Sequence, residues 1–516
     1  MNSRVRWPIA IMFVASVVSA GCTKSLLKTT AQKQPLGRPA ARTGADYPAF
    51  GLSAGLHGEL SMVLIEQDKT VPRIRILFNR SMDYGATWLR PVTIAEETKP
   101  NTQLSLPAMW LDATEVSLAW RRKSGADKTI YFAGSTDRGQ TWPAEPVGLI
   151  RNGQPFAPIQ WADPGGHRYI FWQDEARSIK DLKFMASGDA GATWPAQPIL
   201  LTAHLAATGK RGNRAYARAI TSDQAGRVYV AWHEKSLLPS LSHRLVLNRS
   251  ADFGQSWLSE PVTIRDLPGS EGHNIGSLSL VADAAGHVYL AWEEPHPDGS
   301  DIYITRSDDS GTTWPYPPIR LNSTSPSVVT IARQLRLATG PTGTLYAAWT
   351  ERVSEARKRI AFRQSTDFGS HWGSIRFLDG DAPEGLFSEN PSLKADATGR
   401  VYAAWEQWYE REGWPEWRVF FTRSEDRGAT WLREPIRLDT LPQSSSRLRL
   451  KYPRLFADRE GTVYVVWQGD PFGREDGFLN RSRDYGRTWL SKEQWLTDPS
   501  AWPPGESKSA GIEPPR

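Results

Sequence analysis

The stretch Ser81-Met82-Asp83-Tyr84-Gly85-Ala86-Thr87-Trp88 sets a pattern that returns through nearly the whole chain. The same order of Ser, Asp, Gly, Thr or Ser, and Trp begins again at seven more serines, which are Ser135, Ser187, Ser250, Ser307, Ser365, Ser424 and Ser482. Only the sixth copy departs noticeably, because His371 occupies the Thr position. The copies start 52 to 63 residues apart. Self-similarity at a nearly constant spacing predicts a repeat architecture with one supersecondary unit per copy.

Each copy has the residues of a tight hairpin turn. Asp accepts hydrogen bonds from turn amides, Gly supplies φ > 0, and Trp packs under the turn. The motif resembles the Asp box of sialidases and other BNR-repeat proteins. This resemblance implies that the eight turns are structural and that they lie on the side away from any active site.

The segments around each copy predict four strands per unit. In the seventh unit, period-two alternation and bounding glycines predict strands over 391–396, 401–405, 418–423 and 435–438. A four-stranded antiparallel sheet repeated radially is a propeller blade, so we expect an all-β fold in which residues 46–497 form a single β-propeller of about eight blades. Seven blades with a spare unit is the alternative. Ring closure stays open, because no strand is obviously shared between the ends.

The N-terminal segment has the features of an export signal. Arg4 and Arg6 precede an apolar stretch from Trp7 to Val18, and small residues then lead to Cys22, the one cysteine of the chain. This order resembles a bacterial lipobox, which implies lipidation of Cys22 and a place in the cell envelope, in the periplasm or at the cell surface. Ser19 stands where the lipobox prefers an aliphatic residue, so cleavage without lipidation is the alternative. An uncleaved anchor is disfavoured because crossing a bilayer takes roughly 20 apolar residues.

The basic charge of the chain is concentrated before the repeats. The formal net charge is +6, of which residues 1–22 carry two positive charges and residues 23–45 carry five, so about −1 remains for the rest. Residues 23–45 are therefore expected to form a flexible basic tether near anionic headgroups. Residues 498–516, rich in Pro, Gly and Ser, are expected to be a disordered tail. The nearly neutral repeat region argues against a nucleic-acid partner.

A row of acidic residues follows the predicted second strands. These strands end in Trp in seven units, and the residue two positions further is acidic in several; the row comprises Glu66, Asp174, Glu234, Glu294 and Glu351. Such carboxylates could act as general acids or bases. The favoured interpretation is structural, with backbone or Arg partners between blades.

Three arginines lie 118 residues apart on the predicted first strands of units four, six and eight. They are Arg218, Arg336 and Arg454. If their side chains converge, three guanidinium groups would form a carboxylate receptor, an arrangement similar to the arginine triad of sialidases. The alternative is that each Arg bridges neighbouring blades.

The segment Tyr452-Pro453-Arg454-Leu455 is similar to the strand on which sialidases carry their Tyr nucleophile. The resemblance implies Tyr452 as nucleophile and Glu389 as its base. Two departures speak against an enzyme. First, the position that is Glu in the family falls on Asn390, with Glu389 beside it. Second, the segment most similar to the family's Phe/Tyr-Arg-Ile-Pro motif, residues 71–74, has these residue types in the wrong order. Tyr452 as an ordinary packed strand residue is the alternative.

Aromatic residues gather between the second and third strands of the seventh unit. Trp405 and Trp417 are assigned to strands, and Trp408, Tyr409 and Trp414 to the loop between them, which would cross the ligand face. Exposed Trp and Tyr offer flat surfaces to sugar rings or to a partner protein. A loop folded over its neighbour, with its rings buried, is the alternative.

Two functions remain from these observations. One is a non-catalytic propeller that binds a glycan or an envelope protein, and the other is a sialidase-like exo-glycosidase acting on an acidic sugar. The two departures from the sialidase pattern favour binding. No cofactor is expected, because no phosphate loop, zinc spacing or calcium loop stands out, and the sequence does not indicate an oligomeric state.

Overall fold

The computed structural model describes residues 45–496 except 56–57, 69–70, 106, 112–114, 151–152, 164, 176–179, 208–213, 237–241, 269–274, 284, 324–330, 382, 412–413, 442–448, 459 and 471–475. The expected export signal with Cys22, the tether and the tail at 498–516 lie outside this part. Within it the chain is all-β apart from one short helix, α1 (Ala203–Ala207). No helix of the described part has the length and apolar character needed to cross a membrane.

The strands follow one another in units, which we number by the copy of the Ser81–Trp88 motif that each contains. Units 1 to 4 comprise β1 (Ala45–Ala54), β2 (Leu60–Asp68), β3 (Ile74–Ser81), β4 (Val92–Glu97); β5 (Thr102–Leu104), β6 (Ala108–Leu111), β7 (Val116–Ser124), β8 (Asp127–Ser135), β9 (Val147–Ile150); β10 (Pro155–Ala162), β11 (Arg168–Asp174), β12 (Asp181–Ser187), β13 (Ile199–Leu200); and β14 (Arg214–Ser222), β15 (Val228–Ser236), β16 (Ser242–Ser250), β17 (Val262–Pro268).

Units 5 to 8 repeat the same build. They comprise β18 (Leu278–Ala282), β19 (Val288–His296), β20 (Gly299–Ser307), β21 (Ile319–Arg320); β22 (Ala332–Thr339), β23 (Leu345–Ser354), β24 (Arg357–Ser365), β25 (Arg376–Phe377); β26 (Leu386–Ala395), β27 (Val401–Arg411), β28 (Trp414–Ser424), β29 (Ile436–Arg437); and β30 (Leu450–Ala457), β31 (Val463–Gly469), β32 (Asp476–Ser482), β33 (Gln494–Trp495).

Within each unit the strands pair antiparallel in chain order, as in β1-β2-β3-β4. Unit 2 has a divided first strand, since β5 and β6 both pair with β7. Units 6 and 7 are joined into one sheet by a single residue pair between β24 and β26. The prediction of four strands per unit is confirmed, and the four segments predicted for unit 7 fall on β26 to β29.

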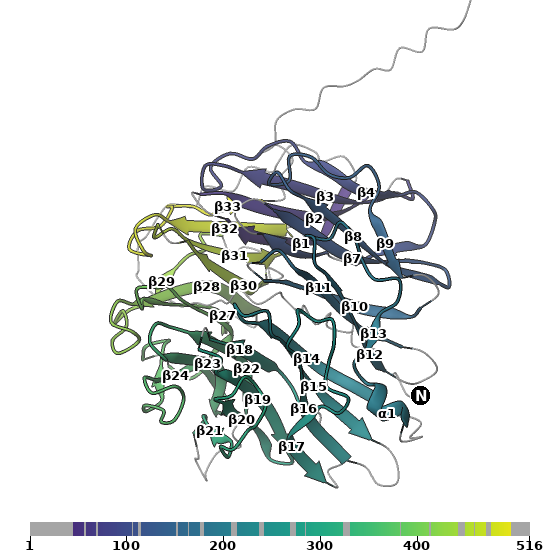
Figure 1. Ribbon diagram of the computed structural model, residues 1–516. Helices are drawn as coiled ribbons and strands as arrows, with labels where there is room; N and C mark the ends of the chain where they lie inside the picture. Colours follow the sequence, from purple (N-terminus) through teal and green to yellow (C-terminus); the bar gives the residue numbers. More distant parts are fainter. Residues whose placement is uncertain are drawn as a thin grey trace, which may run out of the picture.

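Each unit packs on the next through apolar side chains. The second strands contribute fully buried indole rings, which are Trp120, Trp172, Trp232, Trp292, Trp349, Trp405 and Trp467. Hydrophobic clusters join units 1 to 8 successively along the chain. One further cluster joins the two ends of the series, because Leu60 and Met62 of unit 1 pack with Tyr464 and Leu479 of unit 8. Figure 1 shows these two sheets, purple and yellow, side by side.

The first strands of the units lie on the inside of this arrangement. They contact one another in succession from β14 through β18, β22 and β26 to β30, while β6 contacts both β1 and β10, and β30 contacts β1. The fourth strands have no such neighbours among these contacts. The first strands therefore converge, so the side chains that they direct to the inside lie near one another.

The repeated turns are held by their Asp side chains. In unit 2, Ser135 Oγ donates to Asp137 Oδ1 at 2.7 Å, and the Thr141 hydroxyl and amide donate to the same carboxylate. These hydrogen bonds from Thr141 hold the pKa of Asp137 at about 2. The Ser-to-Asp bond recurs in all eight copies at 2.6 to 2.8 Å. In the sixth copy His371 Nδ1 lies 2.6 Å from Asp367 Oδ2, so the ring takes over the role of the Thr hydroxyl.

Candidate functional site

The repeated turns and Tyr452 lie at opposite ends of the sheets. Ser482, where the turn of unit 8 begins, pairs with Val463 at the start of β31, whereas Lys451 pairs with Gln468 near the end of that strand. We call the end that carries Tyr452 the mouth; it is formed by the starts of the first strands and the hairpins between second and third strands. The expected separation of Tyr452 from the turns is confirmed.

Three successive first strands carry a bulge at the mouth. The pairing register shifts in β22, β26 and β30, and the extra residues are Gln334, Asn390 and Tyr452. Their φ angles are 60°, 53° and 53°. Residues other than glycine are uncommon in this left-handed region and persist where the surroundings hold them. The bulges therefore need a partner for their displaced amides.

Side chains of the preceding unit supply that partner. Gln334 Oε1 accepts a hydrogen bond from the Asn390 amide at 2.8 Å. Glu406 Oε2 accepts one from the Tyr452 amide at 2.6 Å, and Glu406 Oε1 accepts another from Asn390 Nδ2 at 2.7 Å. The bulges of units 6, 7 and 8 are thus coupled by a chain of hydrogen bonds.

Glu406 belongs to the candidate site, although the sequence patterns did not indicate it. Its side chain is 3% exposed, and burial raises its pKa to about 8. It follows Trp405 directly, whereas the acidic row that we followed lies two residues after each Trp. On a strand, that difference of one residue places the carboxyl on the other face. The feature that could have indicated Glu406 is an acidic residue that directly follows a buried Trp and lies opposite the start of a first strand.

Glu389 lies beside this group but is engaged elsewhere. It faces Glu406 across the β26–β27 ladder, and its carboxylate forms an ion pair with Lys358 Nζ of unit 6. Lys358 also lies 5.9 Å from the centre of the Phe387 ring. The described partner of Glu389 is therefore a lysine, and its predicted role as base for Tyr452 stays a prediction.

Tyr452 is presented at the mouth. The residue is 44% exposed, and its φ of 53° turns the side chain out of the normal strand pleat. Glu406 contacts Tyr452 through the backbone amide. Of the two interpretations, an ordinary packed residue does not fit this exposure, and the ring is accessible to a ligand.

The ladder register separates Arg218 from the other two predicted arginines. Arg336 pairs with Ala348 and Arg454 with Val466, each of which precedes a buried Trp, whereas Arg218 pairs with Trp232 itself. A shift of one residue reverses the face of a strand side chain. Accordingly Arg218 points back to unit 3, with its guanidinium 5.8 Å from the centre of the Phe171 ring. The expected equivalence of the three positions is wrong for Arg218.

Arg336 and Arg454 do come together. Burial and, to a lesser extent, the charge of Arg454 lower the pKa of Arg336 to about 10. Burial also lowers the pKa of Arg454. Both side chains are surrounded by protein yet keep partial contact with solvent. Two neighbouring cations in such a place repel each other and favour the arrival of an anion.

The acidic row two residues after each Trp is structural. Trp232, Trp292 and Trp349 each donate the indole N–H to the acid two positions further, at 3.0, 2.9 and 2.8 Å. Glu294 also forms an ion pair with Arg265 of the preceding unit at 3.0 Å. Glu234 also pairs with Arg244, and the two remaining members have cationic partners, which are Arg75 for Glu66 and Lys183 for Asp174. The structural interpretation is confirmed.

The aromatic residues of unit 7 lie on a β-hairpin. Because β27 and β28 extend to Arg411 and back from Trp414, Trp408 and Tyr409 are strand residues, and the expected loop is wrong. Trp408 is half-buried and stacks on Phe387, with ring centres 4.1 Å apart. Tyr409 is half-buried too, while the side chain of Trp414 lies outside the described residues. The hairpin thus extends beside the Glu389–Lys358 pair.

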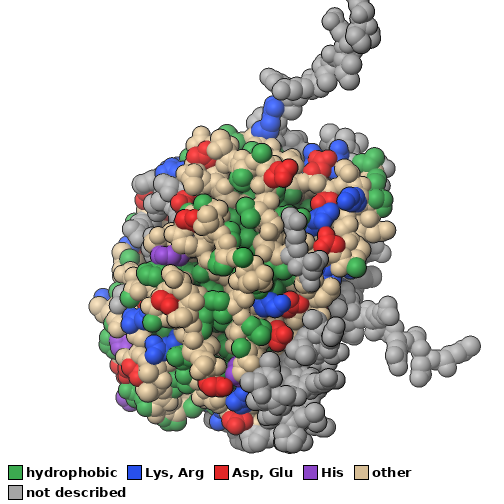
Figure 2. Space-filling view, turned by 45° about the vertical axis from the view of Figure 1, so that its right-hand side comes forward, with side chains coloured by type: hydrophobic (Ala, Val, Ile, Leu, Met, Phe, Trp, Pro, Cys, Tyr) green, Lys and Arg blue, Asp and Glu red, His purple; other side chains and the backbone are tan. Residues whose placement is uncertain are grey.

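The charges of the described residues are mixed on the face that Figure 2 shows. Figure 2 shows Lys, Arg, Asp and Glu side chains interspersed on the described part of one face, without a large area of one charge. Among the described residues, no group of three or more His, Cys, Asp or Glu side chains is arranged to hold a metal ion. The mouth of units 6 to 8 is the candidate site.

Comparison with known proteins finds structural similarity only. No family model and no curated protein matches the chain. A polysaccharide lyase, a PL25 ulvan lyase, is similar at a TM-score of 0.47 and 10% identity, over 77% of this chain and 96% of that one. The α-L-arabinofuranosidase arb93a from Fusarium graminearum has a TM-score of 0.37 and 12% identity, over 64% and 93%. Oligopeptidase B from Leishmania major has a TM-score of 0.44 and 11% identity, over 83% and 53%. Two of these three neighbours are carbohydrate-active enzymes.

Proposed function

We propose that the chain is a closed eight-bladed β-propeller of the sialidase-like Asp-box kind, exported and lipid-anchored at Cys22, whose mouth binds an acidic carbohydrate. The lipid anchor rests on the lipobox-like sequence alone. Ring closure is supported by the cluster between units 1 and 8 and by the hydrogen bond from Arg481 to the Asp83 carbonyl.

The observation that carries the binding proposal is the proximity of Arg336 to Arg454, which lies on β30 two residues after the exposed Tyr452. The two guanidinium groups lie close enough for the charge of one to lower the pKa of the other. A ligand carboxylate offsets this repulsion and accepts charge-assisted hydrogen bonds. An aromatic ring beside it provides the apolar face on which a sugar ring packs. Carboxylate and sugar face together describe an acidic sugar.

Binding to a carbohydrate array tests this proposal. The array carries glucuronate, galacturonate and N-acetylneuraminate beside neutral glucose and galactose, and the full-length chain is compared with the double variant Arg336→Met/Arg454→Met. We expect retention on the acidic sugars only, and a loss of at least about tenfold in the double variant. Equal retention on neutral sugars, or an unchanged affinity in the variant, would reject the proposal.

An exo-glycosidase acting on an acidic sugar is the second candidate. One observation favours it, which is the strained backbone that holds the Tyr452 phenol outward at the mouth. In this reaction Tyr452 Oη bonds to the anomeric carbon as the glycosidic C–O bond breaks, and the phenol proton leaves to the departing alcohol through a neighbouring carboxyl group. Water then replaces the tyrosyl oxygen and restores the phenol, so that one water is added across the bond.

Hydrolysis of a fluorogenic sialoside or glucuronide separates the two candidates. Turnover that Tyr452→Phe abolishes identifies an enzyme. Absence of turnover, together with retention on the acidic sugars, identifies a binding protein. Glu389→Gln then tests the predicted role of Glu389 as the base. That role needs a test because the Glu389 carboxylate already pairs with Lys358.

A further inference from the structure

Exposed aromatic rings mark two places at the mouth. Among the described residues, the large apolar side chains that stand out into solvent are Val71, Met82, Leu89, Val92, Val147, Phe156, Leu258, Tyr316, Phe368 and Tyr452. Only Phe156 and Tyr452 of this set lie on first strands. Both occupy the beginning of their strand, which is the end at the mouth.

Phe156 belongs to unit 3. It pairs with Gln173 at the end of β11, as Lys451 pairs with Gln468 in unit 8, so it occupies the corresponding level of the mouth. Its ring is 37% exposed, and the Arg121 guanidinium of unit 2 lies 5.3 Å from the ring centre. An aromatic face and a cation thus meet at this level of the mouth.

A second cation lies in the same cluster. The charge of Glu175 acts on both Arg121 and Arg218, so the two guanidinium groups share one carboxylate neighbour. Lys180 also pairs with Glu175 at 2.7 Å and lies 5.4 Å from the centre of the Tyr216 ring. The two cations Arg121 and Lys180 therefore outnumber the carboxylate of Glu175 among the described side chains of this cluster.

We infer that Phe156 and Arg121 form a second subsite for an acidic sugar, and that the ligand is an acidic oligosaccharide long enough to occupy both this subsite and the one at Tyr452. The inference rests on the proposed function and names its ligand class. Units 1 and 2 separate the two subsites along the ring of first strands, so a single sugar contacts one of them only. A chain that contacts both converts the second contact into an intramolecular one, which raises affinity without any new type of interaction.

Affinity as a function of chain length tests this inference. The probes are oligogalacturonides of defined length, from the monosaccharide to about ten residues, titrated against the full-length chain by calorimetry. We expect affinity to rise by about a hundredfold beyond a threshold length. Phe156→Ala should remove that rise while the monosaccharide still binds at the subsite of Tyr452, whereas Tyr452→Ala should weaken the binding of both the monosaccharide and the long oligomers.

The chain offers a matched control. Phe368 is 39% exposed but lies in the turn of unit 6, at the end away from the mouth. Phe368→Ala should leave all affinities unchanged, and Phe156→Leu, which keeps apolar contact, guards against a folding defect in the alanine variant.

The outcomes are distinct. If Phe156→Ala binds long oligomers as tightly as the parent chain while Tyr452→Ala does not, the second subsite is rejected and the proposed function stands. If Phe156→Ala weakens the monosaccharide and the long oligomers equally, the two clusters are not separate subsites and the inference falls. If no acidic probe of any length binds, the proposed function fails together with the inference.

Discussion

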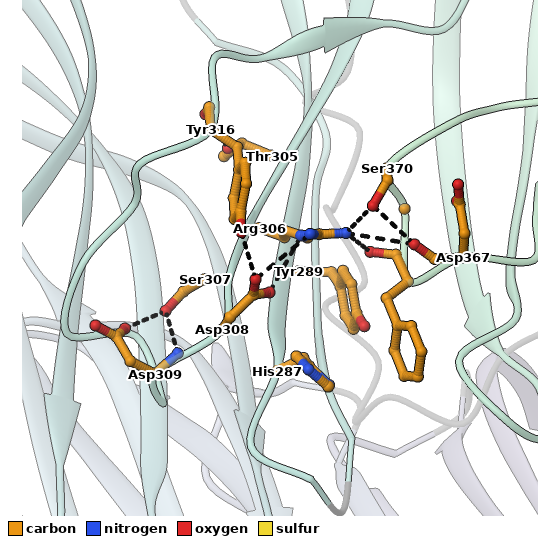
Figure 3. A network of polar contacts seen from close by, with 12 residues as sticks. His287, Tyr289, Thr305, Arg306, Ser307, Asp308, Asp309, Tyr316, Asp367 and Ser370 are labelled. Carbon is orange, nitrogen blue, oxygen red and sulfur yellow. Dashed lines mark hydrogen bonds and ion pairs between the residues drawn. The ribbon is translucent and has the colours of Figure 1, made fainter.

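The Arg481 guanidinium donates a hydrogen bond to the carbonyl oxygen of Asp83 at 2.9 Å, across 398 positions of the chain. Arg481 Nη1 also donates to the carbonyl of the next residue, Tyr84, and the corresponding bond links successive units elsewhere: Arg80 Nη1 donates to the Arg138 carbonyl at 3.2 Å and Arg306 Nη1 to the Phe368 carbonyl at 2.6 Å. Each donor directly precedes the Ser of a repeated turn. Figure 3 shows Arg306 reaching from its own turn, beside Asp308 and Tyr316, to Ser370 in the next. Unit 8 therefore meets unit 1 through the same kind of contact that joins neighbouring units.

Removal of this contact should loosen the ends of the series first. Arg481→Ala is expected to lower the free energy of unfolding by roughly 1 to 3 kcal/mol, the range for a hydrogen bond from a charged donor. Arg433→Ala, at an exposed position, is the control and should change little. Urea denaturation measures both. Equal stability of the two variants would show that the hydrophobic cluster holds the ends without Arg481.

The buried Glu406 carboxyl should make stability depend on pH. Its pKa is about 8 in the folded chain and lies near its ordinary value of 4.5 after unfolding. Between these values the folded state binds the additional proton, so the free energy of unfolding should fall as pH rises from about 5 to about 8, by up to 1.4 kcal/mol per pH unit. Glu406→Gln cannot titrate and should flatten this slope, at the cost of one acceptor for the amides of Asn390 and Tyr452. Parallel slopes in denaturation series of the two proteins would contradict this assignment.

Local chemistry explains what the sequence could predict. Asp137, Gly139 and Thr141 hold one turn by themselves, and the four strands around it follow from alternation and bounding glycines, so neither depends on distant partners. Equal spacing of the three arginines along the chain does not give Arg218 the same pairing register as Arg336 and Arg454. Gly226 and Gly343 of the corresponding turns are 117 residues apart, one fewer than Arg218 and Arg336.

The coupling at the mouth depends on contacts between units, and its signals are weak in the sequence. The bulges at Asn390 and Tyr452 show as extra residues only when the pairing is known. Glu406 becomes informative once it is seen to hold both amides of the neighbouring strands. The sequence predicts a loop at Trp408 because the other second strands end at a Trp. In unit 7 the second strand β27 continues past Trp405 to Arg411.

The turn carboxylates should confer acid sensitivity of the opposite sign to that of Glu406. Hydrogen bonds from Thr141 hold the pKa of Asp137 at about 2 in the folded chain, below its ordinary value of 3.8. The stabilisation is therefore complete above about pH 4 and is lost as pH falls towards 2. Asp137→Asn should lower the melting temperature at neutral pH, and its difference from the parent chain should shrink through that window. Asp381→Asn, at an exposed position outside the turns, should behave as the parent chain at every pH.

The pair of Arg336 and Arg454 on the first strands should lower stability while it serves the proposed binding. Arg336 and Arg454 are surrounded by protein and repel each other, so replacing one with a neutral side chain of similar length removes an unfavourable term. Arg336→Met is expected to raise the free energy of unfolding by about 1 to 2 kcal/mol and at the same time to weaken retention on acidic sugars. Arg376→Met, at an exposed position on β25 of the same unit, is the control and should do neither. Thermal unfolding without ligand, followed by the array, reads both properties on one preparation. A variant that loses stability together with binding would instead identify Arg336 as a structural bridge between blades, which is the alternative that the sequence left open.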